Sequence, residues 1–493
     1  MHARRYVGIL LLIAVALSTV HVKVGAASRP AGLSAGDWRD IQSQPRDDSR
    51  AAPAGYLKAP NPLKLARFGS AVSISGDTLV VGAPGTLIGS PEIIGNGAAY
   101  VFVRDGDGWT RQADLQASNP GIYDYFGTSV AISGDTIVVG APGEAGDGSG
   151  SADNSVEGAG AAYVFTRADG VWTEQAYLKA DQIGQHYKFG ASVAIDGDTI
   201  VAGMPNGPAT GYEGAAYVFG RTNGAWSQQA YLTASNAKYG DSFGFSVGID
   251  GDIVVVGARW ESSDGSGPSD ESATDAGAAY VFERASGAWT EQAYLKAPNP
   301  EPYDIFGTAV AIDGGTIAVG APHTSPCCLD ARDGDPAEAR SSSAGEVFVF
   351  VRGGQGEAAW VRQAALNSAN ANGSDYFGVS VAIDGDRIVA GAYGEDSDGS
   401  GPADNSASAA GAAYLFVRAS GAWTQHGYRK AFNPDASDYF GAAVAVEGAI
   451  IAVGATDESS DGSGPADNSL WAAGSVYVQR IGARLAMPVV MRP

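Results

Sequence analysis

Acidic side chains recur at a fixed spacing in four stretches of the sequence. Each stretch carries a glutamate, an aspartate three residues later and a second aspartate six residues after that. The four sets are Glu144, Asp147 and Asp153; Glu261, Asp264 and Asp270; Glu395, Asp398 and Asp404; and Glu458, Asp461 and Asp467. Carboxylates among glycine, serine and asparagine residues supply the oxygen ligands that calcium prefers. The pattern predicts calcium sites, and the alternative is a solvated loop whose polar side chains bond to their own backbone.

A second carboxylate recurs two residues before a phenylalanine. It is present in five places, at Asp124, Asp241, Asp304, Asp375 and Asp438. Aspartate is a common turn residue, because its carboxylate accepts hydrogen bonds from nearby backbone amides. We therefore expect these aspartates to cap turns. Tyrosines flank several of them, as in Tyr123–Tyr125.

No set of residues typical of an enzyme is found. Beyond residue 26 the only histidines are His186, His323 and His426, and they stand at unrelated positions. The sequence has no nucleophile motif, metalloprotease helix or phosphate-binding loop. Acidic pairs can serve a glycoside hydrolase or a polysaccharide lyase, but pairs repeated four times indicate a structural role. We expect a protein without enzymatic activity and with calcium as its one cofactor.

A repeat through most of the chain positions these residues. Phenylalanine followed by glycine occurs seven times, at Phe68, Phe126, Phe189, Phe243, Phe306, Phe377 and Phe440. Further glycines stand eight and fourteen residues after every one of these phenylalanines. The first of them predicts a tight hairpin turn, and the second ends an apolar strand such as Ile137–Ala141. Each copy therefore predicts four strands. The first runs from the Phe-Gly pair, the third carries a GAAYVF-like sequence, and the fourth follows a tryptophan.

Seven copies of four strands predict an all-β, seven-bladed propeller over residues 54–480. Small sheets bury both of their faces only when neighbours stack around a ring. The seventh copy ends near Gln479 without a fourth strand, and a matching GYLKA sequence stands alone at Gly55–Ala59. We expect Tyr56–Lys58 to be the outer strand of the last blade, which closes the ring. In this topology the acidic loops share one face with the segments between blades, and we predict binding there.

The two ends of the chain lie outside the repeats. Residues 1–26 combine Arg4 and Arg5 with an apolar run and small residues, which is the layout of a secretory signal peptide, with a membrane anchor as the alternative. Residues 27–53 predict a flexible leader, and residues 481–493 form an apolar tail. Only two cysteines occur, the adjacent Cys327 and Cys328, so no disulfide framework is expected.

The net charge of −23 disfavours nucleic acid and anionic membranes as partners. We expect a secreted or cell-surface monomer without a membrane span after removal of the signal.

The Phe-Gly pairs and the strands that end in Gly-Ala-Pro at Gly82, Gly140 and Gly320 resemble the FG-GAP repeat of integrin α subunits. The sequence is also similar to secreted bacterial proteins with this repeat. The resemblance covers about Gly55–Arg480 and implies a seven-bladed propeller closed by an N-terminal strand. Integrin calcium loops lie between the first two strands, where this chain has tight turns such as Asp196–Asp198, so those ligand positions do not transfer.

The resemblance implies an extracellular binding or adhesion module whose ligand is a protein or a glycan. Two alternatives stay open. One is a carbohydrate-active enzyme that uses the same face, and the other is a passive surface or structural protein.

Overall fold

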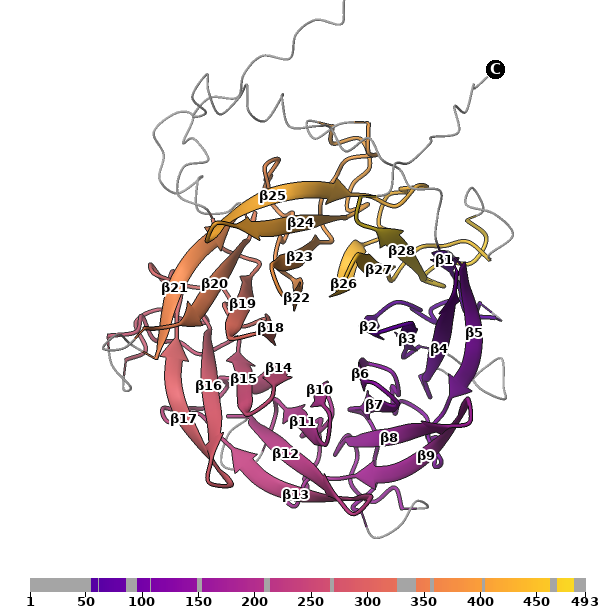
Figure 1. Cartoon of the computed structure of the whole chain (residues 1–493), viewed down its shortest axis with the longest axis vertical. Helices are drawn as coiled ribbons and strands as arrows, with labels where there is room; N and C mark the ends of the chain where they lie inside the picture. The colour runs from indigo at the N-terminus through magenta and orange to yellow at the C-terminus, as the bar shows by residue number, and fades with distance from the viewer. Residues whose placement is uncertain are drawn as a thin grey trace, which may run out of the picture. The chain divides into compact units, whose positions relative to one another are not determined.

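The computed structural model describes residues 55–60, 62–85, 95–106, 108–148, 153–207, 213–266, 270–325, 343–354, 359–400, 404–461 and 468–482. All 28 elements in these ranges are strands, so none of the described elements is a helix that could cross a membrane. The strands form seven antiparallel sheets of four strands each, arranged as a ring (Figure 1). The predicted all-β, seven-bladed propeller is confirmed. The predicted signal peptide, the leader, both cysteines and nearly all of the tail lie outside the described residues.

Each blade contributes one strand to each of four concentric positions (Figure 1). The innermost strands are β2 (Ala71–Ser75), β6 (Ser129–Ser133), β10 (Ser192–Asp196), β14 (Phe243–Asp250), β18 (Ala309–Asp313), β22 (Ser380–Asp384) and β26 (Phe440–Glu447). The second strands are β3 (Thr78–Ala83), β7 (Thr136–Ala141), β11 (Thr199–Met204), β15 (Ile253–Ala258), β19 (Thr316–Ala321), β23 (Arg387–Ala392) and β27 (Ile450–Ala455). The third strands are β4 (Ala98–Asp105), β8 (Ala161–Ala168), β12 (Ala215–Thr222), β16 (Ala278–Ala285), β20 (Glu346–Arg352), β24 (Ala412–Ala419) and β28 (Ser475–Arg480). The outermost strands are β5 (Gly108–Leu115), β9 (Val171–Leu178), β13 (Ala225–Leu232), β17 (Ala288–Leu295), β21 (Trp360–Leu366), β25 (Ala422–Arg429) and β1 (Gly55–Leu57). We number the blades 1 to 7 in the order of their innermost strands.

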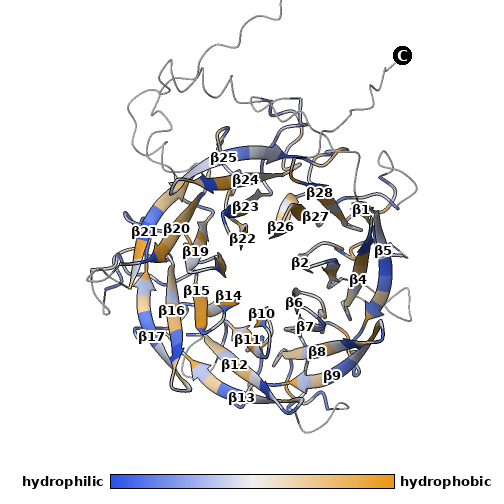
Figure 2. Ribbon diagram, in the orientation of Figure 1, coloured by the Kyte–Doolittle hydropathy of each residue, from blue (hydrophilic) through white to orange (hydrophobic). Residues whose placement is uncertain are grey.

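The composition of a strand matches its place in the blade. All six residues of β7 are buried, and they are apolar except for Thr136. The outermost strands alternate between exposed and partly buried residues, and Figure 2 shows hydrophilic residues along them. The core lies between neighbouring blades: Val80 and Val101 of blade 1 pack in one cluster with Ile137 and Val139 of blade 2. Each blade therefore depends on its neighbours for burial.

The Phe-Gly pair connects one blade to the next. Phe126 forms a parallel bridge with Gly97 of blade 1, and its buried ring packs on Tyr163 and Phe165 of its own blade. A Cβ atom on Gly82 would lie 2.0 Å from the carbonyl oxygen of Gly127, so the close approach of the blades requires glycine there. The prediction that this pair starts the first strand holds only for β14 and β26. In the other five blades the strand begins three residues later.

The N-terminal strand closes the ring, as predicted. β1 pairs antiparallel with β28, and Tyr56 lies opposite Tyr477. The strand ends at Leu57, one residue before the predicted end, and Lys58 lies beyond it. A second contact of the same closure is the bridge between Phe68 and Gly474. The propeller is therefore joined through its outermost strand and through the first Phe-Gly pair.

Candidate binding face

The segments after the second strands and the segments between blades lie together on one face of the ring. In blade 2 the amide of Gly143, just after β7, donates to the carbonyl oxygen of Asp124 at 3.1 Å. The amide of Tyr125 donates to Gly95 of the preceding blade at 2.8 Å. We call this side the acidic-loop face. It comprises the segments between second and third strands and those from a fourth strand to the next Phe-Gly pair.

The glutamates of the four acidic stretches are buried in ion pairs beneath this face. In blade 2 the Glu144 carboxylate accepts from Lys179 Nζ at 2.8 Å, and the two side chains are 1% and 9% exposed. Glu144 Oε1 also accepts from the Tyr177 hydroxyl at 2.9 Å and from Asn119 Nδ2 at 3.1 Å. Lys179 Nζ donates in addition to the carbonyl oxygen of Gly160 at 2.7 Å. Burial lowers the pKa of Lys179, and the bond to Glu144 counteracts this effect.

Three other blades repeat this arrangement. The glutamate and lysine pairs are Glu261 with Lys296, Glu395 with Lys430, and Glu458 with Lys58. In the last pair the lysine follows the N-terminal strand β1, and Tyr56 donates to Glu458 as Tyr177 does to Glu144. The copies without an acidic stretch have Gln116, Thr233 and Asn367 where the lysine would stand. Glutamate and lysine therefore occur together or not at all.

Sequence reasoning missed these lysines, although this co-occurrence was a readable signal. It grouped each glutamate with the two aspartates that follow, and the structure divides that group. The lysine neutralises the glutamate, and a tyrosine and an asparagine donate hydrogen bonds to it, so its oxygens are already satisfied. The described aspartates take no part in this pair: the first aspartate of each loop is exposed, and Asp153, Asp270 and Asp404 are half-buried.

In three of the four loops the second aspartate bonds to its own loop. Asp153 Oδ2 accepts from the Asp147 amide at 2.7 Å and from the Ser155 hydroxyl at 2.8 Å. These bonds lower the pKa of Asp153. The same bonds are made by Asp270 and by Asp404. Asp467 lies outside the described residues.

This bonding is what the solvated-loop alternative predicts. Among the described residues, no three aspartate, glutamate, histidine or cysteine side chains are grouped to hold a metal ion. Calcium binding by these loops stays a prediction.

The aspartates before the phenylalanines cap turns, as predicted. Each accepts a bond from the amide three residues earlier, at 2.5 Å for Asp124 and 2.8 Å for Asp375. The other three are Asp241, Asp304 and Asp438. All five are buried, and burial raises their pKa values, to about 6 for Asp124 and about 7 for Asp375.

Large apolar side chains are exposed mainly on this face. Among the described residues, nine such side chains are exposed, and seven belong to the acidic-loop face: Ile122, Tyr123, Tyr125, Tyr239, Trp260, Tyr303 and Trp471. Val171 and Tyr231 are the two exceptions. An accumulation of this kind is typical of a binding surface, because exposed apolar area is usually kept small elsewhere.

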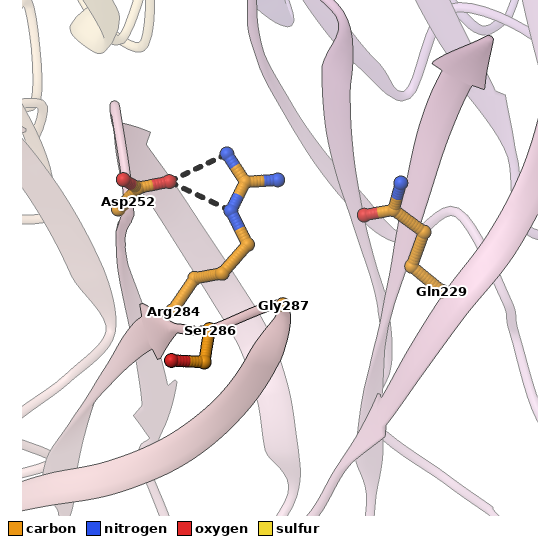
Figure 3. Close-up of a pocket in the computed structure, with 5 residues that line it drawn as sticks. All are labelled: Gln229, Asp252, Arg284, Ser286 and Gly287. Carbon is orange, nitrogen blue, oxygen red and sulfur yellow. Dashed lines mark hydrogen bonds and ion pairs between the residues drawn. The ribbon is translucent and has the colours of Figure 1, made fainter.

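The face of the ring opposite the acidic-loop face is formed by the hairpins between first and second strands and between third and fourth strands. These hairpins carry arginine–aspartate pairs. One pair joins Arg284 to Asp252 at 2.5 Å beside a hollow of about 540 Å³, which Gln229 of the preceding blade borders (Figure 3). Four other blades have the same pair, formed by Arg104 and Asp77, Arg167 and Asp135, Arg221 and Asp198, and Arg418 and Asp386. A pair that recurs in five blades and satisfies its own charges indicates a structural role.

Comparison with known families gives one result. The family model described as FG-GAP repeat matches residues 56–102, 109–165, 172–219, 226–282, 289–350 and 360–416, which is more than half of the chain. Each matched segment begins in an outermost strand and ends in the third strand of the next blade. No curated protein matches the chain.

Proposed function

The chain belongs to the FG-GAP repeat family, and from this premise we propose that it is a secreted or cell-surface module that binds an extracellular protein or glycan. One observation carries the proposal: among the residues that the structure describes, seven of the nine exposed large apolar side chains lie on the acidic-loop face. Tyrosine and tryptophan are the residues most enriched in binding surfaces, since each combines a large apolar ring with a polar tip.

The scaffold supports the use of this face. Loops that a rigid core holds in place can present side chains without ordering on binding. Beneath the face, the buried pairs such as Glu144 with Lys179 anchor the acidic loops to the fourth strands. The exposed rings therefore project from a fixed base. Export is the matching proposal for location, and it is supported by the signal-like sequence of residues 1–26.

The alternative of a carbohydrate-active enzyme has less support. A glycoside hydrolase needs one acid and one nucleophile or base, placed together around a single bond. Among the described residues the buried glutamates stand in four separate blades, and each is paired with a lysine. A carboxylate whose oxygens are already bonded to a lysine does not suit a general acid, which must hold a proton and deliver it to the substrate.

A panel of immobilised glycans and extracellular proteins tests the proposal with the mature chain. We expect retention without turnover, and we expect a Tyr123→Ser, Tyr303→Ser double variant to lose it. Val171→Ser is the matched control, because Val171 is 62% exposed but lies in a hairpin outside the acidic-loop face. Turnover of a glycan would support the enzyme instead. The absence of both retention and turnover would support a passive structural protein.

A further inference from the structure

A pocket on the acidic-loop face differs from the rest of the ring. It has a volume of about 330 Å³ and lies where blades 4, 5 and 6 meet. Its aromatic walls are Trp260, Tyr303, His323, Tyr376 and Tyr393. The Tyr376 and Tyr393 rings stack at 5.2 Å, and His323 packs on Tyr376 at the same distance. The volume is at the lower end of the range for ligand pockets, so it suits one ring-sized group.

Arg259 gives this pocket a cation that makes no ion pair with another described residue, although Asp275 also lines the pocket. Its guanidinium lies 3.6 Å from the centre of the Phe245 ring and 4.4 Å from that of Trp260. Its Nε is buried and has no hydrogen-bond partner in the part of the chain that the structure describes. Burial lowers the pKa of Arg259 to about 10, so the group is still charged at neutral pH. Burying a cation without an anionic partner is costly, and an anionic ligand would offset this cost.

The pocket is built where the repeat departs from its own pattern. In blades 1, 2 and 5 a proline follows the Gly-Ala that ends the second strand, but Arg259 and Tyr393 stand at this position in blades 4 and 6. The residue before the Phe-Gly pair has a positive φ in all seven blades, and only in blade 5 is it β-branched: this residue is Ile305, which also lines the pocket. These departures come from three blades and meet in one place.

We propose that this pocket binds a sugar acid, with the ligand carboxylate on Arg259 and the sugar ring against the aromatic walls. A guanidinium binds a carboxylate through two parallel hydrogen bonds, and we assign these to the terminal nitrogens of Arg259 because its Nε is buried. The three tyrosines, Thr308 and Asp275 line the pocket, and their side chains carry oxygens that can bond to sugar hydroxyls. A purely aromatic acid would leave these groups unsatisfied. The inference rests on the proposed binding function and names its ligand class.

The charge of the rest of the molecule sets the size of the ligand. A net charge of −23 repels a densely charged polymer before it reaches the surface. A single acidic residue at the end of a neutral chain meets less repulsion, and it fits a pocket of about 330 Å³. The ligand is therefore one terminal uronic-acid residue rather than a polyuronate.

Calorimetric titration of the mature chain with sodium D-glucuronate tests the inference. D-glucose, acetate and benzoate are the comparison ligands, because they lack the carboxylate, the ring and the hydroxyls respectively. We expect glucuronate to bind at least about tenfold more tightly than each of them, a difference of about 1.4 kcal/mol. Equal binding of glucose, or tighter binding of benzoate, would overturn the assignment to a sugar acid.

Variants locate the site. Arg259→Gln is expected to weaken glucuronate binding at least about tenfold, as the loss of a charged hydrogen bond does. Arg284→Gln is the matched control, because Arg284 also lies over a tryptophan but belongs to the opposite hairpins. If Arg259→Gln does not fold, Tyr303→Ala replaces it, since that ring is 59% exposed. Unchanged binding in the folded variant contradicts the proposal.

The glycan and protein panel separates the two proposals. If a macromolecule is retained by the mature chain but not by the Tyr123→Ser, Tyr303→Ser variant, and glucuronate does not bind, the binding function stands and this inference fails. If glucuronate binds but no macromolecule is retained, the pocket assignment stands and the wider function fails.

Discussion

Single residues show how this ring tolerates buried charge. Each glutamate under the acidic-loop face has a lysine, a tyrosine and an asparagine as partners, and copies that lack the glutamate also lack the lysine. Burying a carboxylate without a partner lowers the stability of the fold by several kcal/mol. A buried ion pair whose hydrogen bonds are all made is much closer in stability to a pair of apolar residues. The partners therefore have to change together.

Removal of one partner tests this dependence. Lys179→Met is expected to lower the free energy of unfolding by about 3 kcal/mol, because Glu144 is left charged and buried. Addition of Glu144→Gln should recover a large part of the loss. Thr233→Met introduces the same residue at the matching place in blade 3, which has no glutamate, and should cost less than about 0.5 kcal/mol. Urea unfolding measures all three, and equal losses at positions 179 and 233 would contradict the pairing.

A second test at this scale concerns Trp289. In blades 2, 3 and 6 the corresponding tryptophan donates to a glutamine of the preceding blade, as Trp226 does to Gln175 at 2.9 Å. Trp289 Nε1 is buried without a partner in the described residues. Its expected acceptor, Gln229, folds over Gly220 instead, where a Cβ atom would lie 1.7 Å from Gln229 Nε2.

Gly220→Thr should therefore redirect Gln229. The change copies Thr166, which stands at the same place in blade 2. We expect an increase of about 1 kcal/mol in the free energy of unfolding, from the restored hydrogen bond to Trp289 and the loss of a glycine within a strand. In a Trp289→Phe background the hydrogen-bond part of the gain should vanish. A gain of the same size in both backgrounds would mean that the glycine alone is responsible.

At the scale of elements, sequence intervals predicted the blades better than the contacts between them. The constant distances of eight and fourteen residues from each Phe-Gly pair fixed the hairpins, since a hairpin is a local structure. The bridge from Phe126 to Gly97 joins two blades, so the spacing of residues within one repeat could not predict it. Lys179 was missed for a similar reason: it stands 35 residues after Glu144, beyond two further strands. Periodicity shows what a unit is, but not which atoms of two units meet.

The segments between blades make stability depend on pH. In the unfolded chain the capping aspartates have pKa values near 3.8, and in the folded chain burial raises them, to about 6 for Asp304 and about 7 for Asp241 and Asp438. The folded chain therefore binds more protons than the unfolded chain between about pH 4 and 7. In that window the free energy of unfolding falls as the pH rises. For Asp124, Glu144 strengthens the rise in pKa and Lys179 opposes it.

Thermal melts at pH 5.5 and pH 8 measure this effect. We expect the melting temperature to be a few degrees higher at pH 5.5, where much of the capping set is protonated. Asp375→Asn keeps an oxygen for the amide of Asn372 but removes the titration, so it should reduce the difference. Asp153→Asn is the control, because hydrogen bonds lower the pKa of that aspartate and its titration lies below the window. A higher melting temperature at pH 8 would contradict the raised pKa values.

At the scale of the whole molecule, the ring is closed by a short strand with strong side-chain contacts. The Tyr56 ring packs on Tyr477 at 5.3 Å and on Phe432 at 5.4 Å, and its hydroxyl donates to Glu458. Lys58 neutralises Glu458, as the lysine after the fourth strand neutralises the matching glutamate in blades 2, 4 and 6. The closure was predictable because the seventh copy lacks an element that the N-terminus has in excess. The pocket at Arg259 was not, because its residues come from three blades.

Deletion of residues 1–59 should therefore damage the molecule far more than deletion of residues 1–53. Both changes remove the leader, but only the longer one exposes the edge of β28 and leaves Glu458 without Lys58. The expected loss is about 3 kcal/mol or more in the free energy of unfolding, together with aggregation through the open edge. Glu458→Gln in the longer deletion should recover stability without restoring solubility, because it removes the unpaired charge but not the edge. Equal melting temperatures for the two deletions would show that the ring holds without its first strand.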